Sequence, residues 1–291
     1  METMTPGETG VRVIANAEMA AAWDGPEGEH WAHHADRYEQ IGERQLSRLL
    51  SAAEVSPTDT VLDIGCGTGA ATRAFALAAS EGAAVGIDLS SQMLQRARDK
   101  ATAAGIPNVS FVQGDAQVHE FPAGEYSLAV SAMGTMFFAD PVAAFTNIGQ
   151  ALQPGGRLAI LTWRALELNE WLTAVRGALA VGRDLPSPPL GAPGPFGLAD
   201  PDHVRHVLDG AGFTGIDLTP SNEPAIFGSD ANDAFDFVSS FGITRGLTQG
   251  LSEADRATAM ANLRQIMTDH ATLGGVEFAT AAWLITARRS S

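Results

Sequence analysis

Three acidic residues stand at positions where short apolar segments end and a ligand could be held. Asp63 lies in the segment VLDIGCGTG, Asp88 in GIDLS and Asp115 in QGDA. A carboxylate that accepts hydrogen bonds from two hydroxyl groups forms charge-assisted bonds worth about 1.5–3 kcal/mol each. Carboxylates recognise the ribose of nucleotides in this way. We therefore expect Asp88 to bind a ribose diol.

A glycine-rich loop follows Asp63 directly. Gly65, Gly67 and Gly69 permit backbone torsions that other residues disfavour, and they let a ligand approach the N–H groups at the start of the next helix. The spacing Gly65-x-Gly67-x-x-Ala70 also satisfies the looser dinucleotide fingerprint. The loop by itself therefore leaves an NAD(P)-dependent oxidoreductase open.

Asp115 supplies a third contact that helps to separate the alternatives. Its carboxylate could accept a hydrogen bond from the exocyclic amine of adenine, while the backbone N–H of Ala116 donates to a ring nitrogen. The sequence also has no evident Tyr-x-x-x-Lys pair of the kind an oxidoreductase would use. Both observations favour S-adenosylmethionine over a nicotinamide cofactor.

The elements that must position these residues alternate along the chain. Short β-branched segments alternate with longer segments of helical period, which is typical of βαβ units around a parallel sheet. Two further strands are expected near residues 215–220 and over residues 278–287. The first five strands are expected at residues 60–64, 84–89, 109–112, 127–132 and 157–162.

The motifs together resemble the class I S-adenosylmethionine-dependent methyltransferases, particularly the ubiquinone/menaquinone-type small-molecule enzymes. The resemblance covers residues 58–164 through VLDIGCGTG, GIDLS, GDA, MFFADP and LQPGGRLAILTW. It implies an α/β, Rossmann-like, doubly wound sheet of seven mostly parallel strands with an antiparallel last strand. It also implies S-adenosyl-L-methionine as cofactor and S-adenosyl-L-homocysteine as product.

The resemblance assigns roles to individual residues. Asp63 would lie near the amino group of the cofactor, Asp88 would bind its ribose, and Leu89 would pack on its adenine. Ser127 departs from the family pattern, because relatives often carry Asp at this position. The cofactor-binding residues implied are Asp63, Gly65, Cys66, Gly67, Asp88, Leu89, Asp115, Ala116, and Ser131 or Met133 beside the sulfonium.

Candidates for a general base and for acceptor contacts come from two other segments. EHWAHHADRY contains His33 and His34 as tentative bases, although these histidines fit a solvated amphipathic helix equally well. Tryptophans after the fifth strand suggest a flat or apolar acceptor, or else anchor an insertion to the core. The tentative acceptor-binding residues are Trp31, Tyr38, Phe137, Trp163, Arg164, Asn169 and Trp171.

Three stretches lie outside the βαβ pattern and predict a cap. We expect an N-terminal helical lid over residues 1–56 and a cofactor-binding core over residues 57–291. Cap insertions are expected within that core at about residues 164–199 and 229–275. Phe and Met residues in the last insertion fit either a buried core or the roof of an acceptor pocket.

Composition limits the class of protein. Of 291 residues, 45% are apolar, which excludes dominant disorder. The net charge of −16 disfavours nucleic acid as a partner. The single cysteine, Cys66, and the start METMTPGETG predict a cytoplasmic protein without a secretory signal. No membrane insertion and no metal site are expected.

The sequence therefore predicts methyl transfer to an O, N or C atom of a small molecule. Two alternatives stay open: a non-catalytic sensor or scaffold that binds S-adenosylmethionine, and an NAD(P)-dependent oxidoreductase. The acceptor is not identified by the motifs. Composition also leaves open whether the chain forms a homo-oligomer.

Overall fold

The computed structural model describes residues 13–187, 189 and 191–290. The start METMTPGETG and the first twelve residues of the expected N-terminal lid lie outside the described residues. In the part of the chain that is described, no helix combines the length and apolar character needed to cross a membrane.

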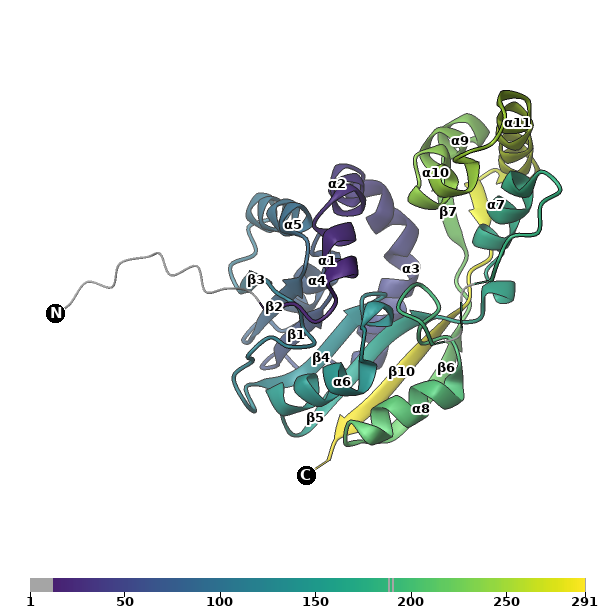
Figure 1. The fold of residues 1–291 in the computed structure, drawn as a ribbon. Coiled ribbons are helices and arrows are strands. Elements are labelled where there is room, and N and C mark those ends of the chain that lie inside the picture. The colour runs from purple at the N-terminus through teal and green to yellow at the C-terminus, as the bar shows by residue number, and fades with distance from the viewer. Residues whose placement is uncertain (1–12, 188, 190, 291) are drawn as a thin grey trace.

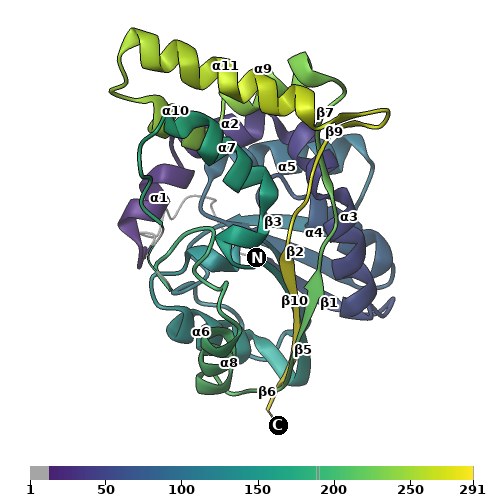
Figure 2. The same cartoon turned by 90° about the vertical axis from the view of Figure 1, so that its right-hand side faces the viewer.

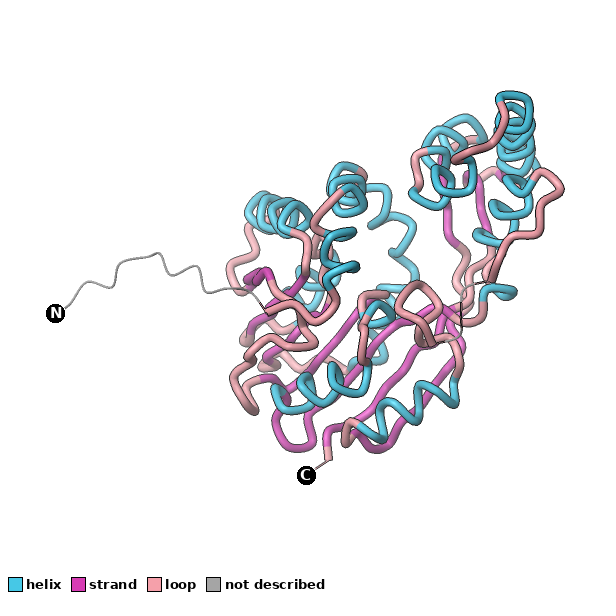
Figure 3. The backbone as a smooth tube through the Cα atoms, viewed as in Figure 1, coloured by secondary structure: helices cyan, strands magenta, loops and turns pink. Residues whose placement is uncertain are grey.

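A seven-stranded sheet forms the centre of the molecule, as predicted (Figures 1 and 3). The strand order is β3-β2-β1-β4-β5-β10-β6, and β10 alone runs antiparallel to its neighbours β5 and β6. The strands are β1 Thr60–Ile64, β2 Ala83–Asp88, β3 Val109–Gln113, β4 Tyr126–Ala132, β5 Leu152–Trp163, β6 Phe213–Ser221 and β10 Ala282–Arg289.

Helices cover both faces of this sheet (Figure 2). Leu49 and Phe75 pack on one face, and Phe145 and Val207 pack on the other, all fully or almost fully buried. The helices on the first face are α3 Ala35–Ala53, α4 Ala70–Ala78 and α5 Ser91–Ala103. Those on the second are α6 Pro141–Ala151 and α8 Pro201–Gly210.

Side-chain caps explain where several helices begin. Asp140 accepts a hydrogen bond from the N–H of Ala143 at the start of α6, and Asp200 caps α8 in the same manner. A proline follows each cap, where its missing N–H leaves no bond unmade. These caps fix where the crossover helices start relative to the strands.

The C-terminal strand differs from the sequence-based prediction. The segment expected as one strand over residues 278–287 is split into β9 (Gly275–Phe278) and β10. Between them, the carboxylate of Glu170 accepts from the N–H of Ala279, and the amide oxygen of Asn169 accepts from the N–H of Ala281. Side chains from a distant part of the chain therefore replace strand pairing at this point.

The remaining elements form two groups beside the carboxyl ends of the strands. The N-terminal helices α1 (Ala17–Trp23) and α2 (Pro26–His33) precede α3. A cap lobe stands apart from the main sheet in Figure 1 and includes a small sheet of order β7-β9-β8 that the sequence did not predict. Its other elements are α7 Glu170–Ala180, β7 Ala225–Gly228, α9 Ala231–Ser239, α10 Gly242–Thr248, α11 Glu253–Asp269 and β8 Ala271–Thr272. Two short 3-10 turns, η1 (Thr135–Phe137) and η2 (Leu166–Leu168), follow β4 and β5.

Candidate active site

A cavity of about 510 Å³ opens at the carboxyl ends of the central strands. This is the edge where open parallel sheets bind ligands, next to the point at which strand order reverses between β1 and β4. Asp63, Asp88 and Asp115 all line it, from the ends of three neighbouring strands. Other residues expected at a cofactor also line it: Gly65, Cys66, Gly67, Leu89, Ala116 and Met133.

The glycine loop is held tightly against its surroundings. Gly65 has a φ of 64°, and a Cβ there would lie 2.8 Å from the Cα of Gly134. Gly67, at φ 54°, donates its backbone N–H to the Oδ2 atom of Asp88 over 2.8 Å. Since side chains rarely adopt these torsions, glycine at both positions lets the loop turn beside the cavity.

Asp88 is fixed by the backbone around it. Its Oδ1 atom accepts from the N–H of Ser90 over 2.8 Å, and its Oδ2 atom accepts from Gly67. Burial nevertheless raises the pKa of this carboxyl, against the lowering effect of the two N–H groups. Each carboxylate oxygen can accept a further bond, so the geometry fits a ligand that brings hydroxyl donors.

Asp63 has an unsatisfied atom in the same cavity. Thr72 donates its hydroxyl to Oδ2 over 2.7 Å, whereas Oδ1 has no hydrogen-bond partner among the described residues. The side chain is 1% exposed, and burial raises its pKa to about 7, with the nearby Asp88 charge adding to the effect. A buried acceptor without a partner is costly, so a cationic ligand group that donates to Oδ1 would fit this position.

Asp115 is partly engaged by the N-terminal segment. The backbone N–H of Ala15 donates to its Oδ2 atom over 2.8 Å, and that of Gln117 donates to Oδ1 over 3.0 Å. The chain just before α1 therefore lies beside the residue expected to bind adenine. This contact spans a hundred positions of the sequence and could not be seen in the motif QGDA.

Met133 and Ser131 were both candidates for a position beside the sulfonium, but only one of them lines the cavity. Met133 lines the cavity with a φ of 67°, a left-handed conformation that is uncommon for a side-chain-bearing residue and is often found at functional sites. Ser131 does not line the cavity. It is fully buried, donates its hydroxyl to the carbonyl of Ile64 and accepts from the N–H of Gly134, so it joins β4 to β1.

Tyr38 and Trp31 also line the cavity. Their rings stack with centroids 3.6 Å apart and planes within 6°. The hydroxyl of Tyr38 lies 3.1 Å from Nε2 of His30, whose pKa is lowered to about 4 by burial and by nearby His34 and Arg245. Burial raises the pKa of the Tyr38 hydroxyl well above its ordinary value. Both groups therefore stay neutral at pH 7.

The tentative bases His33 and His34 do not line the cavity. His34 packs edge-on against Phe237, and burial lowers the pKa of its ring. His30, which lies in the same segment, was not singled out by the sequence. Its proximity to Tyr38 arises because α2 ends at His33 and α3 begins at Ala35, a bend that the residue types do not reveal.

The other residues expected at the acceptor divide into two groups. Trp163, Trp171 and Phe137 line the cavity. Asn169 and Arg164 do not, for structural reasons. Asn169 is fully buried, donates its amide to the carbonyl of Arg164 and accepts from the N–H of Ala281 just before β10. Arg164 lies over the ring of Trp283 and donates to Asn222.

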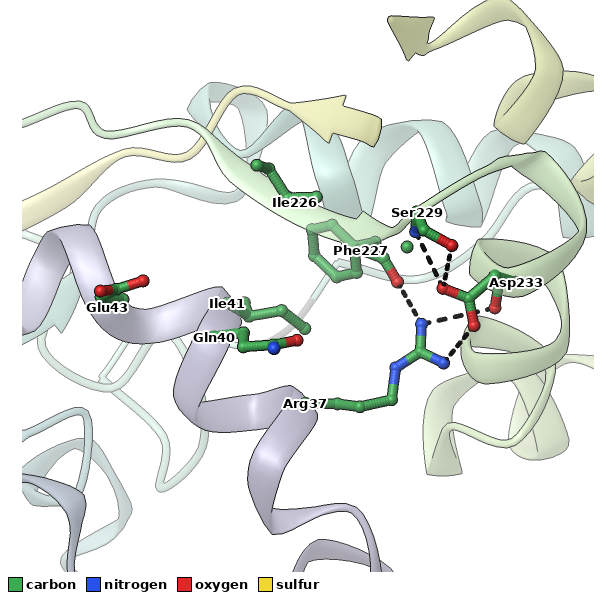
Figure 4. Close-up of a pocket in the computed structure, with 9 residues that line it drawn as sticks. Arg37, Gln40, Ile41, Glu43, Ile226, Phe227, Ser229 and Asp233 are labelled. Atoms are coloured by element: carbon green, nitrogen blue, oxygen red, sulfur yellow. Dashed lines mark hydrogen bonds and ion pairs between the residues drawn. The ribbon is translucent and has the colours of Figure 1, made fainter. Parts of the chain in front are cut away.

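A second, open groove of about 440 Å³ lies on the other side of α3 (Figure 4). Arg37 reaches across it from α3, donating to the carbonyl of Phe227 over 2.8 Å and pairing with Asp233 at 2.5 Å. Ser229 donates its N–H to the same carboxylate. Arg37 thus ties the N-terminal helices to the cap lobe. Ile41 borders both this groove and the main cavity.

Comparison with known proteins agrees with this geometry. Residues 61–156, from β1 into β5, match the family described as methyltransferase domain. Aklanonic acid methyltransferase DauC of Streptomyces sp. (strain C5) is 36% identical over 113 residues, which cover 38% of this chain and 51% of that protein. Nocamycin O-methyltransferase of Saccharothrix syringae is 31% identical over 182 residues, 58% of this chain and 64% of that protein.

The stretch from β1 into β5 is therefore similar to methyltransferases. The fold of the chain is shared with phosphoethanolamine N-methyltransferase 2 of Haemonchus contortus, solved with S-adenosyl-L-methionine. The TM-score is 0.57 at 17% identity over 95% of this chain and 61% of that one. The chain spans only about half the length of the first curated relatives it matches. Within the described ranges, the chain has no cluster of three or more His, Cys, Asp or Glu residues that could hold a metal ion.

Proposed function

We propose that the protein transfers a methyl group from S-adenosyl-L-methionine to a small-molecule acceptor. The observation that carries this proposal is the convergence of Asp63, Asp88 and Asp115 on a single cavity that is also lined by aromatic rings. In this proposal Asp88 binds the ribose, Asp115 and Ala116 bind the adenine edge, and Oδ1 of Asp63 accepts from the amino group. The cofactor would supply a methyl group on a cationic sulfur.

The protein's own contribution is to hold the acceptor in line with that methyl group and to exclude water. Orientation alone can supply roughly 7–11 kcal/mol, whereas a general base adds about 10²–10⁴-fold to a rate. Trp31, Tyr38, Trp163 and Trp171 provide a rigid apolar wall for this positioning. Cys66 takes no part as a nucleophile, since burial and the charges of Asp88 and Asp63 raise the pKa of its thiol.

Two alternatives make different demands on the cavity. A sensor or scaffold that only binds S-adenosylmethionine needs no room for an acceptor, so the aromatic half of the cavity supports turnover. An NAD(P)-dependent oxidoreductase is favoured only by the glycine spacing. The names of the relatives DauC and nocamycin O-methyltransferase support methyl transfer to small molecules.

An assay with methyl-labelled S-adenosylmethionine tests the proposal. The full-length protein is incubated with phenols, quinols, amines and carboxylic acids, and labelled products are identified. We expect label in at least one small molecule, at a rate that falls for the variant Asp88→Ala when the donor is below saturation. A protein that binds the donor but labels none of these acceptors would support the sensor instead.

A cytoplasmic location and the exclusion of nucleic acid remain predictions from the sequence. The acidic balance of the chain supports the second of these. The oligomeric state is open in this proposal.

A further inference from the structure

The cavity is bordered by a nearly continuous series of aromatic rings. On the side of the N-terminal helices, Phe137 meets Trp23 edge-on at 5.2 Å between centroids, and Trp23 meets Trp31 at 6.0 Å. Trp31 in turn stacks on Tyr38 at 3.6 Å. All four residues line the cavity, although they come from η1, α1, α2 and α3.

The series continues through the cap lobe. Tyr38 stacks against Phe241 at 5.9 Å, and Phe241 lies 6.3 Å from Phe227, both behind the cavity lining. Phe227 stacks on Trp171, which lies 5.9 Å from Trp163 at the end of β5.

The series is closed beside the strand ends. The backbone N–H of Trp163 donates to the Sδ atom of Met136, the residue before Phe137. We call the rings that line the cavity the aromatic girdle: Trp23, Trp31, Tyr38, Phe137, Trp163 and Trp171.

The charges around the girdle are already paired. No Lys, Arg or His is found among the described residues that line the cavity. Glu39 pairs with Arg73 at 2.9 Å and with Lys100 at 2.7 Å, and Glu27 pairs with Arg245 at 3.0 Å. Outside the three strand-end carboxylates, the lining therefore offers no free charge to a ligand.

Two polar side chains of the lining are also satisfied by the protein. Gln45 donates its amide to the carbonyl of Ser221 and accepts from the Ser221 hydroxyl over 2.7 Å. Thr280 donates its hydroxyl to the carbonyl of Glu223. A ligand beside the girdle would meet mainly rings and aliphatic carbon, together with one open donor, the buried Nε1 of Trp171, which has no hydrogen-bond partner among the described residues.

We propose that the aromatic girdle binds a planar aromatic acceptor and discriminates against carboxylates. This proposal rests on the proposed function, and it names the substrate class of the same site. A carboxylate would be buried without a cation, which costs far more than burying a neutral ring. A flat neutral ring instead gains offset or edge-on contacts with the girdle.

Two probes of one shape separate these classes. 2-Naphthol and 2-naphthoate carry the same ring and are neutral and anionic, respectively, near neutral pH. Each is titrated by calorimetry into the full-length protein saturated with S-adenosylhomocysteine, so that no turnover occurs. We expect 2-naphthol to bind about tenfold or more tightly than 2-naphthoate.

Two variants connect the preference to the girdle. Trp31→Leu keeps an apolar side chain but removes a ring, and it should weaken 2-naphthol binding about threefold to tenfold. Phe235→Leu is the matched control, because Phe235 lies under Arg264 in the cap lobe and outside the cavity. This control should leave 2-naphthol binding unchanged. Both variants should bind S-adenosylhomocysteine as the parent does, which shows that they fold.

A gain of charge gives an independent test. Ile41→Lys introduces a cation on the wall shared with the open groove, and it should shift the preference from 2-naphthol toward 2-naphthoate. The proposal is overturned if the parent protein binds S-adenosylhomocysteine but binds 2-naphthoate as tightly as 2-naphthol, or binds neither probe. Failure to bind S-adenosylhomocysteine itself would instead overturn the proposed function.

Discussion

The free oxygen of Asp63 predicts a pH dependence of donor binding. The carboxyl has a pKa of about 7 in the free protein, because it is buried. An ammonium group that donates to Oδ1 would favour the ionised form, so binding would release a proton below this pKa. Affinity for S-adenosylmethionine should therefore rise from about pH 6 to about pH 8 and then level off. Calorimetric titration in buffers of different ionisation enthalpy measures both the affinity for the donor and the number of protons released on binding.

Asp63→Asn should bind the donor more weakly and remove most of this pH dependence. Asp140→Asn is the control, because Asn also caps a helix and residue 140 lies outside the cavity. A pH dependence that survives in Asp63→Asn would assign the titration to another group.

Asp88 gives a prediction about the ribose. Asp88→Ala should weaken donor binding by about 1.5–3 kcal/mol through lost hydrogen bonds. Because Asp88 also holds the N–H groups of Gly67 and Ser90, part of that loss could come from the loop. S-adenosylhomocysteine lacking a ribose hydroxyl separates the two effects. The parent should discriminate against the deoxy ligand, and the variant should not. Equal discrimination by both proteins would argue against a contact between Asp88 and the sugar.

At the scale of residues, the sequence predicted which side chains could bind a ligand better than it predicted which side chains contact one another. Asp63, Asp88 and Asp115 could be found because each lies at or just after the carboxyl end of a strand, and these ends meet at one edge of a parallel sheet. Ser131 and Asn169 were expected to contact a ligand, but their side chains form hydrogen bonds with backbone groups of the protein. His30 was missed since its contact with Tyr38 depends on the bend between α2 and α3. Trp23 was missed because nothing near it in sequence marks a cavity.

At the scale of elements, periodicity and caps predicted most strands and the crossover helices, and the resemblance to methyltransferases implied that seven strands form one sheet. The small sheet β7-β9-β8 escaped prediction, because β7 and β9 pair across a long separation in sequence. The break before β10 depends on Glu170 and Asn169, which reach it from the start of α7. Short-range patterns carry no information about such pairings.

The link between α3 and the cap lobe also yields a prediction. Arg37→Met removes the ion pair with Asp233 and the bond to the carbonyl of Phe227. Because this contact is partly exposed, we expect the free energy of unfolding to fall by only about 1 kcal/mol. Amide hydrogen exchange should increase in β7 and at the start of α9, while donor affinity stays unchanged.

Arg48→Met provides the comparison for this variant. Arg48 lies on the same helix and pairs with Glu223, but its side chain is 64% exposed. The variant Arg48→Met should leave amide hydrogen exchange in the cap lobe unaltered. If both variants changed exchange equally, Arg37 would have no special part in joining α3 to the cap lobe.

At the scale of the whole molecule, the charge of −16 predicts weak attraction to nucleic acid. Fluorescence anisotropy with labelled RNA and DNA duplexes should show no saturable binding at about 0.15 M salt, where electrostatic attraction is already screened. Saturable binding that weakens steeply with added salt would reveal a basic surface and contradict the preference for a small-molecule acceptor.

Calorimetric titration of the full-length protein with S-adenosylmethionine, and separately with NAD⁺, tests the central claim most directly. The three strand-end carboxylates are expected to bind one S-adenosylmethionine per chain, with no detectable heat from NAD⁺ under the same conditions. Binding of NAD⁺ without S-adenosylmethionine, or of neither, would contradict the assignment of this cavity to a methyl donor.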